Sequence, residues 1–154
     1  MKKQALWKTV FCVMLALGVS FLFAEENEKK NKIMVEITDV KTDAGKILLS
    51  VYDSEKNYKK QVPYHTAKMD AAIGTMYYEC ELPDGEYIFA ICHDLNDNEE
   101  MDTGFMGIPK EPFAMSNYDG TGFPGKYDKH KVVINSDKTV PMPLFSFKEA
   151  NKKN

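Results

Sequence analysis

The sequence predicts an all-β fold, an antiparallel Greek-key β-sandwich of about seven strands with one long ordered loop. Three observations support this prediction. Short apolar segments alternate with polar residues at the period of two that a half-buried strand requires. Glycine, proline, asparagine and aspartate cluster between these segments, as they do in turns. No window has the longer apolar period of an extended amphipathic helix.

The first 24 residues have the pattern of a secretory signal peptide. A lysine-bearing segment precedes an almost wholly apolar run over residues 9–23, and Ala24 stands directly before two glutamates. The run is shorter than the roughly 20 residues that a spanning helix needs. We therefore expect residues 1–24 to be removed on export to the periplasm or the cell exterior, with an uncleaved anchor as the alternative.

The composition of the remaining chain argues against a nucleic-acid partner. Of the 20 lysines, three leave with the leader, which leaves 17 against 23 acidic residues and a formal charge of −6. The chain contains no arginine, the residue most used for phosphate and base contacts. We expect a monomer that meets the membrane only through its leader.

After the leader, the chain divides into a charged linker at 25–32, one domain at 33–148 and a polar tail at 149–154. The domain is long enough to form a core without disulfides. Ile33, Val35 and Ile37 alternate with polar residues, and a turn then leads to the apolar segment 47–52, which predicts a first hairpin. Residues 53–69 read as a loop with a short strand at 62–66.

A second hairpin is predicted around the Pro83-Asp84-Gly85 turn, between segments 76–82 and 87–92. The second of these segments is apolar on both faces, as a central strand would be. Segments 131–134 and 140–147 supply the last strands, and prolines in the final segment place it at a sheet edge.

Residues 102–127 are rich in glycine and proline and form the long loop. We expect this loop to be ordered rather than mobile, because it carries many apolar side chains that could anchor it: Phe105, Met106, Ile108, Phe113, Met115, Tyr118 and Phe123.

The cysteines are best read as free thiols. Cys12 is a small apolar residue of the leader. In the second hairpin, Cys80 and Cys92 would lie about 13 Å apart, whereas a disulfide needs Cα atoms within about 7 Å. Two buried thiols are favoured, and a disulfide remains possible if the two strands are not hairpin partners.

Oxygen-bearing residues after the central strand have the spacing of a calcium loop. Asp94, Asn96 and Asn98 take the first, third and fifth positions, Glu100 could offer its carbonyl at the seventh, and Asp102 falls on the ninth. The sixth position is a glutamate instead of glycine, and the twelfth is Phe105 instead of an acid. We expect either a structural Ca²⁺ site or a turn in which these side chains cap their own backbone.

A hydrolase-type enzyme using His93, Asp94 and Glu111 as an acid/base group is the alternative. The evidence for it is weak, because adjacent strand residues point to opposite faces. The other histidines sit in no ligand-spaced motif, and the sequence has no nucleophile elbow, phosphate-binding loop or zinc-protease motif.

Several segments, taken in order, resemble the DUF2141 family of exported bacterial proteins. They are Gly45-Lys46-Ile47 with Val51-Tyr52-Asp53, Leu82-Pro83-Asp84-Gly85-Glu86-Tyr87, the His93–Asp102 run, Gly107-Ile108-Pro109 with Glu111, and Ser116-Asn117. The family usually has glycine where this chain has Glu99. The resemblance implies a sandwich similar to transthyretin-like and carboxypeptidase regulatory-like domains, in which the Leu-Pro-x-Gly-x-Tyr turn joins strands in different ways.

We therefore expect an exported, non-catalytic binding or accessory domain of the cell envelope, with Ca²⁺ as its one candidate cofactor. Its partner would be an envelope component, a carbohydrate or another protein. Tyr118 and Phe123 would form the contact surface if they are not core residues. A purely structural scaffold is a further alternative.

Overall fold

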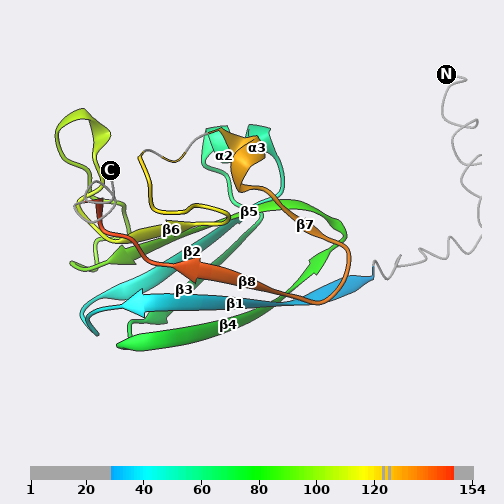
Figure 1. Ribbon diagram of the computed structural model, residues 1–154, viewed down its shortest axis with the longest axis horizontal. Coiled ribbons are helices and arrows are strands. Elements are labelled where there is room, and N and C mark those ends of the chain that lie inside the picture. The colour runs from blue at the N-terminus through cyan, green and yellow to red at the C-terminus, as the bar shows by residue number, and fades with distance from the viewer. Residues whose placement is uncertain (1–28, 123, 125, 148–154) are drawn as a thin grey trace, which may run out of the picture.

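The computed structural model describes residues 29–122, 124 and 126–147, which form two facing β-sheets (Figure 1). The predicted all-β sandwich is confirmed. The described part of the chain contains eight strands and three short helical segments. It holds no helix long and apolar enough to cross a membrane. The proposed leader, the residues directly after it and all of the polar tail lie outside the described residues.

The smaller sheet has three strands in the order β4-β1-β8. β1 (Lys30–Val40) begins three residues before the predicted Ile33 and lies in the middle. It pairs antiparallel with β4 (Gly74–Pro83) and parallel with β8 (Lys138–Pro143), so one pair departs from the antiparallel expectation. β8 lies at an edge of this sheet, as its prolines predicted, and it ends before the predicted residue 147.

The larger sheet has the order β3-β2-β5-β6, with a short β7 also paired to β5. β5 is central, as its apolar faces predicted. The bounds of these strands are β2 Lys46–Tyr52, β3 His65–Asp70, β5 Gly85–Asp94, β6 Phe113–Met115 and β7 Val132–Ile134.

Both predicted hairpins are wrong. β1 and β2 belong to different sheets, and so do β4 and β5. The reason lies in the apolar faces: Leu82 of β4 and Phe89 of β5 are both fully buried in one shared core. A corner that moves the chain from one sheet to the other sets these faces against each other, whereas a hairpin would place them side by side in one layer.

The thiols of Cys80 and Cys92 are free, as favoured, although the hairpin argument for that outcome was wrong. Cys80 is buried on β4 in the smaller sheet, and Cys92 is half-buried on β5 in the larger one. The separation of the sheets therefore keeps the two sulfurs apart.

Residues 53–69 are not a plain loop. α2 (Glu55–Lys60) is capped by Ser54, whose hydroxyl accepts a hydrogen bond from the backbone N–H of Asn57. β3 begins three residues later than the predicted strand. In Figure 1, α2 lies beside α3 (Tyr127–His130). The ring centroids of Tyr58 and Tyr127 are 6.2 Å apart, so the helices form a second small core on the outer face of the larger sheet.

The described part of the long loop contains secondary structure, but fewer of its predicted anchors are buried than expected. It contains the short helix η1 (Phe105–Gly107) and strand β6. Phe113 and Tyr118 are buried and stack with ring centroids 5.6 Å apart, so Tyr118 is not a contact surface. Phe105 and Met106 are instead 87% and 79% exposed at the end of a projecting segment. Phe123 lies outside the described residues.

Candidate functional site

Asp94 is the anchor of the candidate calcium loop. It is the last residue of β5 and its side chain is fully buried. Its two carboxylate oxygens accept hydrogen bonds from the backbone N–H groups of Asn98 (3.2 Å) and Glu99 (2.8 Å). These bonds wind the chain around the carboxylate.

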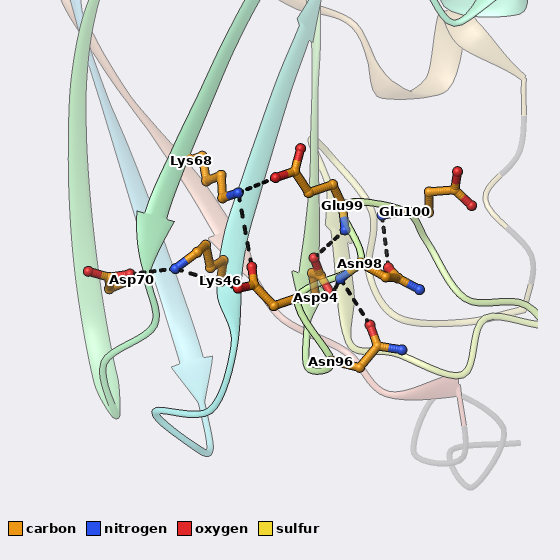
Figure 2. Close-up of polar contacts among 9 residues, drawn as sticks. Lys46, Lys68, Asp70, Asp94, Asn96, Asn98, Glu99 and Glu100 are labelled. Atoms are coloured by element: carbon orange, nitrogen blue, oxygen red, sulfur yellow. Dashed lines mark hydrogen bonds and ion pairs between the residues drawn. The ribbon is translucent and has the colours of Figure 1, made fainter.

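Two of the other predicted ligands, Asn96 and Asn98, lie beside Asp94 (Figure 2), and a third, Asp102, is hydrogen-bonded to both of them. The amide nitrogens of Asn96 and Asn98 donate to the two carboxylate oxygens of Asp102, at 2.9 and 3.3 Å. The side-chain oxygen of Asn96 accepts the backbone N–H of Asn98, 3.3 Å away. In Figure 2 the side chains of Asp94, Asn96 and Asn98 lie together, whereas the carboxylate of Glu100 points away from them. Glu100 can therefore contribute only its backbone.

The backbone of this loop is left-handed at the sixth position, where calcium loops use glycine. Glu99 has a φ of 65°, so the sequence departs from glycine at a position whose conformation demands it. The Glu99 side chain forms an ion pair with Lys68 of β3 (Figure 2). Asp97, with a φ of 58°, lies 4.0 Å from the ammonium groups of both Lys46 and Lys68. The loop is thus tied to the edge of the larger sheet.

Glu111 fixes the far side of the loop. Its side chain is buried, and its two oxygens accept the backbone N–H groups of Leu95 (2.8 Å) and Asp102 (3.0 Å). One carboxylate therefore links the start and the end of the candidate calcium loop. The sequence assigned Glu111 only to the alternative acid/base group, because its spacing from the loop gives no sign of this contact.

His93, Asp94 and Glu111 do not form a converging group. His93 is buried, and its Nε2 lies 2.9 Å from the backbone oxygen of Ala44. The carboxylates of Asp94 and Glu111 are both engaged by backbone N–H groups. Each of the three side chains therefore holds a different backbone segment in place.

A hollow of about 360 Å³ lies beside this loop, on the outer face of the larger sheet. It is open to solvent, and its lining includes Leu48, Ser50, Tyr58, Cys92, Met101 and Met115. Burial, together with the charge and hydrogen bond of Glu111, raises the pKa of the Cys92 thiol to about 12. The sequence did not indicate this hollow, because its residues come from five separate segments.

The ionisation of Asp94 is expected to make the stability of the fold depend on pH. Burial alone would raise the pKa of Asp94, but backbone N–H groups of residues 96–99 outweigh it, and the pKa lies below its ordinary value. A lowered pKa contributes stability above the unfolded-state pKa of about 3.9, and this contribution is lost as the pH falls through the folded-state pKa.

Asp94→Asn should therefore destabilise the protein at pH 7, and the deficit should shrink as the pH is lowered from 5 towards 2. Urea unfolding followed by circular dichroism measures this difference. Asp43→Asn, at an exposed turn position, is the control and should change little at any pH. A deficit for Asp94→Asn that stays constant over this pH range would contradict the assignment.

The fold and the site define the class of this protein: a small two-sheet β-sandwich domain whose central strand leads into a loop rich in Asp and Asn. The chain belongs to the DUF2141 family, described as "uncharacterized protein conserved in bacteria", whose family model matches residues 35–141. No curated protein and no solved structure gives a significant match to the chain.

Proposed function

We propose that this protein is an exported, non-catalytic binding domain of the bacterial cell envelope, and that its Asp94–Asp102 loop binds Ca²⁺ as a structural ion. The leader pattern of residues 1–24 supports export. The observation that carries the calcium proposal is the close approach of the Asn96 and Asn98 side chains to the Asp102 carboxylate, in a loop that winds around Asp94 through a left-handed turn at Glu99.

The charge of the site sets its expected affinity. Among the described residues, no group of three or more His, Cys, Asp and Glu side chains converges as in a high-affinity metal site. Asp94 and Asp102 would be the acidic ligands, and amide and backbone oxygens would supply the others. Few charged ligands give the weak binding of extracellular calcium modules, with a Kd of about 10⁻⁴–10⁻³ M.

The cation would act on the projecting segment that follows the loop. Asp102 lies at the base of this segment, where its backbone oxygen accepts the N–H of Lys110 at 2.9 Å. Thr103 and Pro109 form the next bridge, and Phe105 and Met106 are exposed beyond it. Ca²⁺ bound to Asp102 would fix the base of a segment whose exposed apolar end suits contact with a protein or carbohydrate of the envelope.

The expected result is a higher melting temperature in Ca²⁺. A ligand with a Kd of about 1 mM at 10 mM stabilises the fold by about 1.4 kcal/mol, which corresponds to a rise of roughly 3–6 °C for a domain of this size. Thermal unfolding of the purified protein, with 10 mM Ca²⁺ or with chelator at equal ionic strength, measures it.

Two variants that each remove one negative charge distinguish Ca²⁺ binding at this loop from a general electrostatic effect of the ion. Asp102→Asn should abolish the rise, because it removes an acidic ligand. Glu100→Gln should keep it, because that side chain points away from Asp94 (Figure 2). Equal melting with and without Ca²⁺ would refute the calcium site and leave the loop as a self-capping turn.

A further inference from the structure

We propose that Cys92, Met101 and Met115 form a binding site for Cu(I) in the hollow on the outer face of the larger sheet. The proposed site uses sulfur atoms, whereas the proposed Ca²⁺ site would use oxygen atoms, although Met101 belongs to the Asp94–Asp102 loop. Cu(I) binding is therefore tested by its own experiment, without Ca²⁺.

Three neighbouring segments bring these sulfur-bearing residues to the hollow. Cys92 lies on β5, Met115 lies on β6, and Met101 belongs to the loop that follows β5. Met115 is opposite Ala90 in the β5–β6 register, which makes it the diagonal neighbour of Cys92 on the same face. Diagonal neighbours are within reach of a long side chain such as methionine. All three residues are half-buried, so the site is sheltered and still reachable from solvent.

The spacing of two of these sulfurs suits a shared metal ion. The Sγ of Cys92 lies 3.9 Å from the Sδ of Met101. Two sulfurs that each bond an ion at about 2.3 Å, at a near-trigonal angle of about 120°, are about 4 Å apart. The two ligands therefore need little rearrangement. The Sδ of Met115 accepts a hydrogen bond from the Tyr58 hydroxyl at 3.9 Å, and its flexible side chain would have to turn away from Tyr58 to complete a three-coordinate site.

The chemistry of the three sulfur ligands indicates which metal ion the site would bind. One thiol and two thioethers form a soft donor set, and such sets favour Cu(I). A zinc site would need His, Cys or carboxylate ligands in numbers that do not converge in the described part of the chain. Leu48, Tyr52 and Ala90 also line the hollow and would shield the bound ion from water.

The surroundings of Cys92 also favour a cation. The Oε2 of Glu111 lies 3.6 Å from its sulfur, close enough for the carboxylate charge to attract a positive ion. On binding, the S–H bond of Cys92 breaks, a Cu–S bond forms and the proton passes to solvent, so that no oxidant or reductant is consumed. The two thioethers bind without losing a proton.

The test is a Cu(I) titration of the purified protein against a chromophoric Cu(I) chelator, under anaerobic reducing conditions. All samples carry Cys12→Ser, which removes the thiol of the N-terminal segment. One equivalent of Cu(I) is expected to bind. Cys92→Ala should weaken binding by more than about 100-fold, and Met101→Leu by about 10-fold, because each removes one sulfur ligand.

Matched controls are available in the smaller sheet. Cys80→Ala and Met76→Leu make the same chemical changes on β4 and should leave the Cu(I) affinity unchanged. Equal affinity in Cys92→Ala and the parent protein would overturn the proposal, as would an equal loss in Cys80→Ala. If Cys92→Ala does not fold, the copper X-ray absorption spectrum of the parent protein decides: a sulfur shell supports the site, and a shell of nitrogen and oxygen overturns it.

Discussion

Replacing Gly45 by alanine is expected to destabilise the protein by more than about 3 kcal/mol. Gly45 precedes β2 at the point where it passes the end of β5, and its φ is +70°. A Cβ atom on Gly45 would lie 1.9 Å from the backbone oxygen of Asp94. Neither backbone can move easily, because Lys46 and Asp94 are paired in the sheet. The variant therefore combines an unfavourable φ with a backbone clash beneath the candidate calcium loop.

Gly107→Ala separates these two costs. Gly107 has a φ of +73°, and a Cβ there would meet nothing within 4 Å. Its expected cost is therefore the conformational one alone, about 1–2 kcal/mol. Urea unfolding of both variants at neutral pH measures the difference. Equal losses for the two variants would show that the close approach of Gly45 to Asp94 is not present in solution.

Replacing Glu111 by glutamine is expected to cost about 2–4 kcal/mol of unfolding free energy. The buried carboxylate accepts the N–H groups of Leu95 and Asp102 and contacts the thiol of Cys92. Glutamine has almost the same shape but only one acceptor oxygen, so its NH₂ group would face a buried donor. The start and the end of the Asp94–Asp102 loop would then lose their common anchor.

Glu100→Gln makes the same chemical change on an exposed side chain of that loop, and it should alter the unfolding free energy by less than about 0.5 kcal/mol. Denaturant unfolding gives the free energies, and hydrogen exchange of the Leu95 and Asp102 amides gives the local effect. These two amides should exchange faster in Glu111→Gln than in Glu100→Gln. Unchanged protection in both variants would contradict the role assigned to Glu111.

Local patterns were enough to identify most of the strands, though not β6, because alternation of apolar residues depends only on which face of a strand is buried. Ile33, Val35 and Ile37 alternate in the sequence and are all fully buried in the structure. The position of β5 as a central strand and of β8 at an edge followed from composition in the same way. The pairing of strands did not follow, since a short connection between two strands can be a hairpin or a corner between sheets.

The candidate sites show the same difference between contacts within one segment and contacts between separate segments. The spacing of Asp94, Asn96 and Asn98 within one loop predicted their meeting, because ligands from a single tight loop are brought together by local turns. The contact of Glu111 with the backbone at both ends of that loop, and the approach of Met101 and Met115 to Cys92, depend on where separate segments pack. No local pattern records such an approach.

The sequence by itself determined the all-β class of this protein, the composition of its Asp- and Asn-rich loop and the family to which it belongs. Only the tertiary structure decided that β1 and β4 lie in one sheet while β2 and β5 lie in the other. It also decided that Cys80 and Cys92 stay apart and that a thiol and two thioethers share one hollow. The physical reason is that burying every apolar face in one core is a property of the whole chain, whereas alternation and turn chemistry are properties of a few residues.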